Sequence, residues 1–542
     1  MVTEIELKYS LFENHEVNTA AQVQNIIEQL LTDHELSFTY QKKQLTNCYF
    51  DTPNLSLRKQ KIALRTRGTQ CANEPICYEQ TIKTSGRVIA GLHQRPEYNV
   101  DISDTRPIIS LFPDNLWQPN TNIVDLQSKL IELFSTNFIR HTWLVSIENS
   151  QVELVIDSGE ICCEGLVEQD KIYEVELELV SGNVESIFTL VKLLFSKLSL
   201  RPGQLTKAAR GYALYKKNLQ QESEVESSKA SNLLGKTSQS KAEASAEQPY
   251  SMIMLPKNCS INDAFSQGVE ITLTKLQLAL DSYVAKPSLK VLMQISEYLT
   301  FIRQGFWLFD EVLTAEELKL KAELTYFIRT IHWVDIAEHI DVFLNKQSRY
   351  QKEVRVSQSL ISKLQLSQNR YPNDSQVLAL IHSERFNNLQ LDLLALLLKR
   401  NNENITIEAD AFNLAEFASL KLSESSDILN SELAKLQQPK LHSPSTVYLS
   451  ANSLFIRALL TTSWFNSLFA DFDAVRKYET PRLDIKQGIS ELNFLHLLQQ
   501  QLKQLPKPDE KLAQWVENKS ENLIAALDQS SAKALSIKPY WL

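Results

Sequence analysis

The segment EIELK at residues 4–8 sets the pattern that organises the first part of the chain. Alternate residues of a β-strand point to opposite faces, so Glu4, Glu6 and Lys8 share one face while Ile5 and Leu7 share the other. The polar face of this segment is therefore ionic. The alternation predicts a strand with one apolar face and one charged face.

Similar alternation recurs up to about residue 216, and it predicts eight strands. Their expected ranges are Thr3–Tyr9, Thr46–Phe50, Ile62–Arg67, Ile76–Lys83, Leu92–Val100, Phe138–Glu148, Val152–Asp157 and Ile172–Val180. Apolar residues at three- and four-residue spacing predict helices between them. The expected helices are Ala20–Leu31, Ile123–Phe134 and Val184–Leu198.

The charges on these strands are sorted by sign along the chain. Acidic residues fall near the two ends of the region, whereas Arg65, Arg67, Lys83 and Arg95 lie between them. Carboxylates at alternate positions of a strand stand about 7 Å apart and repel one another, which is costly in a confined space. The acidic positions are Glu4, Glu6, Glu153, Asp157, Glu174, Glu176 and Glu178.

In a closed barrel with the charged faces inward, these charges would line one interior and could bind ligands there. Its acidic arc would take a divalent cation, and its Lys/Arg arc would take phosphate oxygens. This combination favours a magnesium-bound polyphosphate as the ligand. An open antiparallel sheet with ordinary solvated outer faces is the alternative, but solvation alone does not require the sorting by sign.

Composition and charge bound the class of protein. With 542 residues, and roughly 150 residues per domain, about three to four structural units are expected. A hydrophobic fraction of 43 % and a charged fraction of 22 % exclude a wholly disordered chain or a membrane protein. The net charge of −9 argues against non-specific binding of nucleic acid.

The location expected from the sequence is the cytoplasm. No apolar leader follows Met1, and no apolar stretch is long enough to span a bilayer, so we expect no membrane partner. The six cysteines form no paired CxxC pattern, and we expect them to be reduced packing thiols.

The composition and the hydrophobic pattern of the sequence change after residue 216. Residues 217–250 are rich in Gln, Glu, Ser, Lys and Ala and predict a flexible linker. From there to residue 542, Leu, Ile, Phe and Trp recur at helical spacing. The expected fold class is α+β: a barrel domain over residues 1–216, a linker over 217–250 and an all-helical domain over 251–542.

The first region resembles the CYTH domains, the triphosphate tunnel metalloenzymes. EIELK matches their ExExK signature, and further matching blocks follow in order. They are YFDTP at 49–53, ALRTR at 63–67, GLHQRPEY at 91–98, FIR at 138–140, EVELE at 174–178 and LTKAARGY at 205–212. The resemblance implies a closed eight-stranded antiparallel barrel with peripheral helices, and hydrolysis of inorganic triphosphate to pyrophosphate and phosphate with Mg²⁺ or Mn²⁺.

The resemblance also implies roles for individual residues. The residues it implies for metal are Glu4, Glu6, Asp157, Glu174, Glu176 and Glu178. The residues it implies for phosphate are Lys8, Arg65, Arg67, Lys83, Arg95, Arg140, Lys207 and Arg210. Glu4, Glu6 and Lys8 would form the catalytic set. Positioning and charge neutralisation are what phosphoryl transfer requires, and these groups supply both.

The helical region resembles CHAD domains, which are helical bundles with a basic groove. It keeps the aromatic helix ending YLTFIRQGFWLF at residues 298–309, but with one Arg where the resemblance implies several. His332 and His339 lie seven residues apart on a predicted helix, and we interpret them as core or rim residues. We expect a degenerate CHAD-like bundle without a catalytic role, which binds polyphosphate or a protein partner. The final residues 538–542 (KPYWL) are expected to dock on it as an aromatic tail.

Three other functions remain open at this point. Adenylate cyclase and thiamine-triphosphatase activity belong to the same barrel, but each needs a pocket for a base or a thiazole. A non-catalytic polyphosphate-binding protein is the third, and the many carboxylates argue against it because they would weaken binding of an anion.

Overall fold

The structure is a computed structural model, and it describes most of the chain. The described residues are 2–12, 19–71, 74–89, 91–119, 121–203, 205–231, 253–256, 259–345, 356–402, 413–436, 444–469, 471–507 and 509–542. They fall into two compact units. One comprises Met1–Ala244 with Ile381–Leu391, and the other Ser245–Leu380 with Asp392–Leu542.

The first unit is built on ten antiparallel strands. They are β1 (Val2–Leu11), β2 (Ser37–Asp51), β3 (Ala63–Cys71), β4 (Cys77–Lys83), β5 (Arg87–Ile89), β6 (Leu92–Ile102), β7 (Ile131–Ile147), β8 (Ser150–Cys162), β9 (Asp170–Ser181) and β10 (Leu200–Pro202). Its helices are α1 (Ala20–Asp33), α2 (Ser56–Lys59), α3 (Ile123–Ser128), α4 (Glu185–Phe195) and α5 (Lys207–Ser231), with short 3₁₀ turns at Ile109–Leu111 and Asp114–Leu116.

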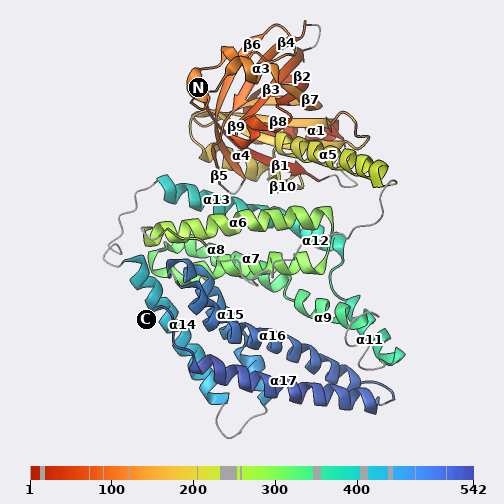
Figure 1. The fold of residues 1–542 in the computed structure, drawn as a ribbon, viewed down its shortest axis with the longest axis vertical. Helices are drawn as coiled ribbons and strands as arrows, with labels where there is room; N and C mark the ends of the chain where they lie inside the picture. Colours follow the sequence, from red (N-terminus) through yellow and green to blue (C-terminus); the bar gives the residue numbers. More distant parts are fainter. Residues whose placement is uncertain are drawn as a thin grey trace. The chain divides into compact units, whose positions relative to one another are not determined.

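Eight of these strands close into a barrel. The order is β1-β9-β8-β7-β2-β3-β4-β6, and β6 pairs back onto β1 to complete the ring (Figure 1). The short strands β10 and β5 add to β1 and β6. The predicted closed eight-stranded antiparallel barrel is confirmed. Because β1 pairs with β9, the acidic ends of the domain sequence become neighbours in space.

One predicted helix is wrong in its second half. Asn122 caps α3, but the helix ends at Ser128, and residues from Ile131 onward belong to β7. The pairing of β2 with β7 shifts register between Tyr49 and Phe50. At this bulge Leu133 and Phe134 are buried next to each other, which gives a strand the apolar spacing of a helix turn.

The charged faces of the strands point inward, and the apolar faces point outward under helices. Glu4, Glu6 and Lys8 are only 8 %, 8 % and 4 % exposed, although charged side chains normally face water. On the opposite face of β1, Tyr9 packs edge-on against Phe195 of α4, with ring centroids 5.3 Å apart. The interior of the barrel is therefore ionic, and its hydrophobic packing lies mainly outside the ring.

The first turns of α5 pack against one part of the barrel wall. Tyr212 and Leu214 join a buried cluster that includes Phe134 and Phe138 of β7. Gly211 lies so close to Phe134 that a Cβ there would stand 2.0 Å from the ring. This close approach places Lys207, the first residue of α5, against the interior.

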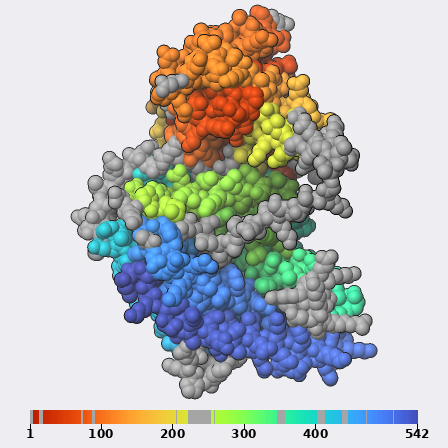
Figure 2. Space-filling view, viewed as in Figure 1, coloured from red at the N-terminus to blue at the C-terminus, as the bar shows by residue number. Residues whose placement is uncertain are grey.

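The second unit is helical throughout its described elements, as predicted. Its helices are α6 (Ile261–Ala285), α7 (Leu289–Leu308), α8 (Ala315–Thr330), α9 (Val334–Leu344), α11 (Gln358–Gln368), α12 (Asp374–Ile381), α13 (Glu384–Asn402), α14 (Leu414–Leu436), α15 (Pro444–Phe465), α16 (Phe472–Lys503) and α17 (Glu510–Ser536), with 3₁₀ turns at Asp310–Val312 and Asn466–Leu468. Ile381 of α12 and the part of α13 up to Leu391 are grouped with the first unit. Figure 2 shows the atoms of α15, α16 and α17, in blue, closely packed on the face in view. Tyr448, Phe455, Ile485 and Ile489 lie in one of the buried clusters between these helices.

Several further features of the sequence have a place in the structure. The C-terminal tail docks on the helical unit, where Trp541 is 7 % exposed and donates to Ser423 Oγ at 3.0 Å. His339 contacts Ser490 Oγ at 2.9 Å and stacks on Phe494, which fits a structural role. All six cysteines are free thiols. Helix α5 extends into the range 217–250 predicted as linker, and residues 232–250 lie outside the described residues.

The domain boundaries inferred from the sequence remain a prediction. Within the described residues, no helix combines the length and apolar character that crossing a membrane requires.

Candidate functional site

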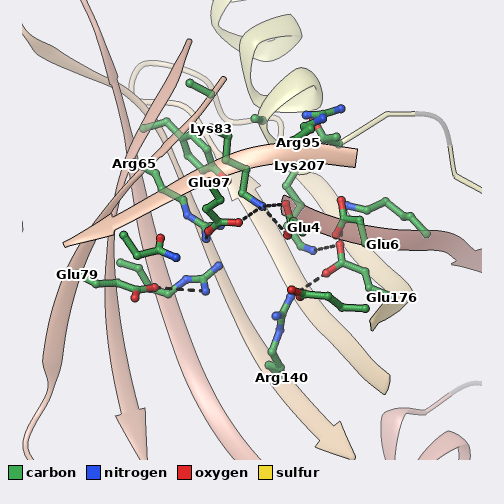
Figure 3. Close-up of a pocket in the computed structure, with 18 of the residues that line it drawn as sticks. Glu4, Glu6, Arg65, Glu79, Lys83, Arg95, Glu97, Arg140, Glu176 and Lys207 are labelled. Atoms are coloured by element: carbon green, nitrogen blue, oxygen red, sulfur yellow. Dashed lines mark hydrogen bonds and ion pairs between the residues drawn. The ribbon is translucent and has the colours of Figure 1, made fainter. Parts of the chain in front are cut away.

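The barrel encloses a chamber of about 350 Å³. Its wall combines residues from the strands with the start of α5 (Figure 3). The charged lining consists of seven carboxylates and seven cationic groups: Glu4, Glu6, Glu79, Glu97, Glu153, Glu176 and Glu178, and Lys8, Arg65, Arg67, Lys83, Arg95, Arg140 and Lys207. The chamber is thus formally neutral when every group is ionised.

The two signs occupy different walls, with exceptions on each. Strands β1, β9 and β8 are consecutive in the ring. They carry the carboxylates of the segments at residues 4–6, 176–178 and 152–157. Strands β7, β3, β4 and β6 carry Arg140, Arg65, Arg67, Lys83 and Arg95. Lys8 stands on the acidic wall, and Glu79 and Glu97 stand on the basic one. The acidic and basic residues that are separated along the sequence therefore lie mainly on different walls of the chamber.

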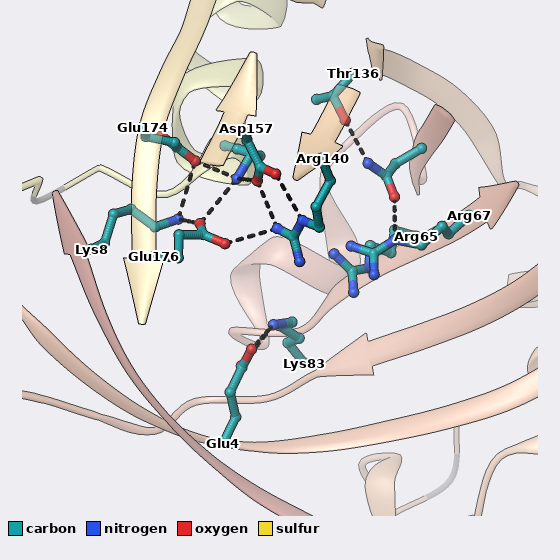
Figure 4. A network of polar contacts seen from close by, with 12 residues as sticks. Glu4, Lys8, Arg65, Arg67, Lys83, Thr136, Arg140, Asp157, Glu174 and Glu176 are labelled. Carbon is teal, nitrogen blue, oxygen red and sulfur yellow. Dashed lines mark hydrogen bonds and ion pairs between the residues drawn. The ribbon is translucent and has the colours of Figure 1, made fainter. Parts of the chain in front are cut away.

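At the α5 side of the chamber, three acids and three bases form a buried network (Figure 4). Arg140 donates to both oxygens of Asp157, at 2.7 and 2.6 Å, and to Glu176 at 2.9 Å. Lys8 lies 2.5 Å from Glu176 and 3.6 Å from Glu174. Lys207 contacts all three carboxylates, including Asp157 at 2.6 Å.

The pKa values of this network follow from the pairing. Burial alone would lower the pKa of Lys8, but Glu174, Glu176 and Glu6 together raise it well above its usual value. Burial would likewise raise the pKa of Glu176, but Lys207, Lys8 and Arg140 hold it well below its usual range. Each ion is stabilised by neighbours of opposite charge, so these attractions offset the cost of burying the charges of the network.

A second set of ion pairs lies across the chamber. Lys83 donates to both oxygens of Glu4, at 2.7 and 2.6 Å, and lies 3.1 Å from Glu97, as Figure 3 shows. Arg65 reaches Glu97 at 3.5 Å. Burial would raise the pKa of Glu97, but Lys83 and Arg65 lower it to about 2.

Two arginines of the basic wall are held by uncharged acceptors. Arg67 donates from Nε to Asn47 Oδ1 at 2.8 Å, and its nearest carboxylate, Glu79, is 3.6 Å away. Arg95 contacts Nδ1 of His93 at 2.7 Å. Because arginine offers only donors, this imidazole nitrogen must be the acceptor and His93 must be neutral. Burial lowers the pKa of His93 to about 4, which agrees with a neutral ring.

Three carboxylates form a row across the acidic wall. Glu6 of β1 pairs in register with Glu178 of β9, which pairs in register with Glu153 of β8. Directly opposed residues of an antiparallel pair hold their Cβ atoms about 5 Å apart. Burial and repulsion from Glu4 and Glu153 raise the pKa of Glu178 to about 7, although Lys83 acts in the opposite direction. Lys83 thus offsets only part of the repulsion, so uncompensated negative charge remains at this row, and the row fits a hard divalent cation.

A second acidic group has the spacing of metal ligands but a different charge environment. Oxygens of Asp157, Glu174 and Glu176 all lie within 4.8 Å of one another, the single such group found in the described part of the chain. Lys8, Lys207 and Arg140 already neutralise these oxygens. A cation would have to displace an ammonium or guanidinium group there, so the charge balance favours the row of Glu6, Glu178 and Glu153.

The residues predicted from the sequence are distributed as follows. Eleven line the chamber: Glu4, Glu6, Lys8, Arg65, Arg67, Lys83, Arg95, Arg140, Glu176, Glu178 and Lys207. Asp157 and Glu174 are buried behind the lining, within the network. Arg210 is not a lining residue: its guanidinium pairs with both oxygens of Asp170 at 2.8 and 2.6 Å, lies 3.5 Å from Glu174 at the edge of the network, and so ties α5 to β9.

Sequence reasoning missed several members of the site. Glu153 was noted on the charged face but was not assigned to metal, although it has the same strand parity as Asp157. Glu79 and Glu97 have the parity of Lys83 and Arg95, which is the signal that could have found them. Asn47 carries no charge and gave no signal in the sequence.

Comparison with known proteins locates the resemblance in the barrel. Residues 3–212 match the family model described as the CYTH domain, which confirms the resemblance inferred from the motifs. A curated relative, the inorganic triphosphatase of Haemophilus influenzae, is 34 % identical over 219 residues, which cover 40 % of this chain and 55 % of the relative. The chain thus matches about half the length of this relative.

Solved structures give weaker likenesses. The CHAD domain from the plant Ricinus communis has 16 % identity and a TM-score of 0.40, covering 54 % of this chain and 98 % of that one. A putative adenylyl cyclase from Hippeastrum, whose structure is described as revealing a dominant triphosphatase activity, has 19 % identity and a TM-score of 0.27, covering 39 % and 95 %. With TM-scores below 0.5, these likenesses carry no conclusion about this chain.

Proposed function

We propose that the barrel hydrolyses inorganic triphosphate to pyrophosphate and orthophosphate with the help of a divalent cation. The observation that carries the proposal is the charge of the chamber, whose seven carboxylates balance its seven cationic groups. Such a chamber has no excess positive charge for a polyanion. A divalent cation entering with the substrate would supply it, which is how hard cations and phosphates usually bind together.

The residues that would hold the cation are Glu6, Glu178 and Glu153, with Glu4 beside them. Three observations support this choice: their direct cross-strand register, their place in the lining, and the raised pKa of Glu178. Carboxylate oxygens are the ligands that Mg²⁺ and Mn²⁺ prefer. The ion would polarise phosphoryl oxygens and neutralise the charge that develops on them.

The phosphate chain would lie along the basic wall. Arg65, Arg67 and Arg95 would donate to its oxygens, since a guanidinium presents paired donors to phosphate. Lys8 and Lys207 would contribute less, because buried carboxylates already hold them. Their part would be to fix the positions of Glu176 and Asp157, which in turn hold Arg140.

In the reaction, water attacks a terminal phosphorus and the bond from that phosphorus to the bridging oxygen breaks. The products are orthophosphate and pyrophosphate, which keeps the bridging oxygen. Arg67 and Arg95 would stabilise the negative charge on the transferred group and on the leaving oxygen, because they are positioned before the reaction begins. The attacking water releases its proton to solvent or to the departing phosphate.

The other barrel reactions find less support. Among the described residues, the aromatic rings in the lining are Tyr49 and Phe138. Tyr49 stacks on Phe134 with centroids 4.6 Å apart, and Lys207 and Arg140 lie over Phe138 at 5.2 and 5.7 Å. Neither ring is available as an open stacking surface, so an adenine or a thiazole would gain little. This disfavours adenylate cyclisation and thiamine-triphosphate hydrolysis.

The test compares Glu153→Gln with Glu164→Gln in the full chain. Glu164 is exposed in a turn and serves as the matched control. Phosphate release from triphosphate is measured with Mg²⁺, with Mn²⁺ and after chelation, alongside ATP and thiamine triphosphate. The proposal expects metal-dependent turnover of triphosphate that falls at least tenfold in Glu153→Gln only. Tight binding without metal-stimulated turnover would favour the non-catalytic polyphosphate-binding protein.

For the helical unit, polyphosphate remains the proposed partner, with a protein partner as the alternative. Burial lowers the pKa of Arg303 on α7, and repulsion from Arg457 and Arg329 adds to the effect. Arg457 lies over the ring of Trp307 at 5.8 Å. Mutual repulsion of three guanidinium groups supports an anion as the occupant. Loss of polyphosphate binding in Arg303→Glu, with triphosphate turnover unchanged, would be the expected result.

The cytoplasm is the proposed location. The six free thiols support a reducing compartment. Fractionation of cells that express the tagged full-length chain tests this part of the proposal.

A further inference from the structure

Arg67 differs from most of the other cationic groups of the chamber in what holds it. Lys8, Lys83, Arg140 and Lys207 each lie within 3 Å of a carboxylate oxygen. For Arg67 the contact at hydrogen-bond distance is the side-chain amide of Asn47, at 2.8 Å, and Glu79 is 3.6 Å away. A neutral group thus fixes this guanidinium.

The geometry around Asn47 spans three neighbouring strands. Asn47 on β2 stands directly opposite Arg67 on β3 and directly opposite Thr136 on β7. Its Nδ2 donates to Thr136 Oγ1 at 2.7 Å, while its Oδ1 accepts from Arg67 Nε (Figure 4). The assignment of the amide is fixed by chemistry, because arginine has no acceptor and only the oxygen can face it.

Asn47 is held firmly enough to act as a support. Its side chain is fully buried, and its oxygen and its nitrogen each have a partner. The contact uses Nε of the guanidinium and leaves the terminal nitrogens for other acceptors; Nη1 lies 3.6 Å from Glu79, and Arg67 lines the chamber. A planar guanidinium held through Nε still offers donors to two oxygens of a phosphate.

The charge around Arg67 is positive on balance. Burial lowers the pKa of Arg67 to about 10, and repulsion from Arg65 and Arg140 contributes more to this decrease than attraction by Glu79 opposes it. A carboxylate at position 47 would relieve this repulsion and would also cancel the charge that attracts a phosphate. An amide of the same shape supplies the orientation without the cancellation.

We propose that Asn47 is a positioning residue for phosphate binding: its neutral amide orients Arg67 toward the chamber and leaves the charge of the guanidinium available to the substrate. This inference rests on the proposed function, because it assigns Arg67 to the phosphate chain. It extends that proposal by stating why an uncharged acceptor, and not an acid, occupies position 47.

The decisive variant is Asn47→Asp, which keeps the shape and the contact with Arg67 but adds a negative charge. Asn99→Asp is the matched control, because Asn99 lines the chamber and its Oδ1 accepts from Thr81 at 2.8 Å. Both variants add one negative charge in the barrel, and Asn47→Asp adds it at hydrogen-bond distance from an arginine of the lining. Binding of inorganic triphosphate to the full chain is measured by calorimetry, and kcat and KM are measured in parallel.

The expected result is a rise of about 10- to 100-fold in Kd and KM for Asn47→Asp, since this is the range spanned by a hydrogen bond to a charged group. Asn99→Asp should change them several-fold less. A double-mutant cycle provides the second measurement: in an Arg67→Ala background, Asn47→Ala should weaken binding no further. A merely structural role would leave the two substitutions additive, and it would spare Asn47→Asp.

The outcomes separate the inference from the function it extends. Wild-type turnover with equal Kd in Asn47→Asp and Asn99→Asp overturns the inference and leaves the function standing. Binding without turnover, with the predicted Asn47→Asp defect, overturns the function and supports the inference. A chain that neither binds nor hydrolyses triphosphate overturns both. If Asn47→Asp does not fold, the cycle with Asn47→Ala decides.

Discussion

Substitution of Glu178 by Gln should stabilise the barrel, and the gain should depend on pH. Burial and repulsion from Glu4 and Glu153 raise the pKa of Glu178 to about 7 in the folded chain, from 4.5. The folded state therefore binds more protons than the unfolded state between these values. Stability falls as the pH rises through this window, because the carboxylate must ionise in an acidic row. Gln carries no charge and removes this penalty.

The expected size follows from the shift. Each pKa unit corresponds to about 1.36 kcal/mol, so a change from 4.5 to about 7 predicts a gain of about 3 kcal/mol at pH 8 and almost none at pH 4.5. Amide hydrogen exchange of peptides from β8 and β9 measures the barrel separately from the helical unit. These measurements are made with a chelator present, and exposed Glu164→Gln is the control.

A divalent cation should reverse the effect. A cation at the row favours ionised Glu178, so Mg²⁺ or Mn²⁺ should stabilise the wild-type barrel more at pH 8 than at pH 5. Glu178→Gln should lose most of this stabilisation, whereas Glu164→Gln should keep it. An equal stability change for Glu178→Gln at pH 5 and pH 8 would refute the assignment of an uncompensated acidic row.

Three further substitutions probe other parts of the unit. Lys207→Met removes a cationic partner of Asp157 and Glu174, so the free energy of unfolding of the barrel, measured by hydrogen exchange, should fall by about 3–5 kcal/mol. Lys129→Met removes a partner from an exposed ion pair and should lower it by about 0.5 kcal/mol or less. Similar losses in the two variants would contradict the buried network. Relative to His93→Gln, wild type should become less stable by about 3 kcal/mol between pH 6.5 and pH 4, because unfolding lets His93 take up a proton; parallel pH profiles of the two chains would exclude this. Gly211→Ala should lower the barrel's stability by about 1–3 kcal/mol, since its Cβ meets Phe134 at 2.0 Å, and unchanged exchange in β7 would disprove the close packing.

The strands were predictable because their side chains alternate so strictly. All eight predicted ranges overlap observed strands, three of them with one residue beyond the strand end, but β2 begins at Ser37 and β7 at Ile131, earlier than the sequence indicated. Both extensions lie where polar and apolar residues do not alternate cleanly. The helix expected over Ile123–Phe134 was wrong beyond Ser128, because the bulge opposite Tyr49 and Phe50 is a property of strand pairing and leaves no mark in a single segment.

The sequence predicted which residues belong to the site better than it predicted which of them form ion pairs with each other. The alternation of side chains along each strand predicted Glu4, Glu6 and Arg67 on the charged, inward faces, and the motif resemblance pointed to the same residues. This alternation did not reveal which carboxylates form ion pairs with cationic side chains. Glu176 and Glu178 lie two residues apart on β9, yet the pKa of the first lies well below its usual range and that of the second is raised to about 7.

The sequence by itself determined which residues share a face of each strand, because alternation fixes the face of each residue, and the sorting of charges by sign favoured a closed sheet over an open one. Only the tertiary structure decided which partners they have. Strand register joins Glu6, Glu178 and Glu153 into one row, and the packing of α5 brings Lys207 onto the neighbouring acids. These contacts join residues far apart in the chain, and their energies depend on distances that only the folded barrel sets.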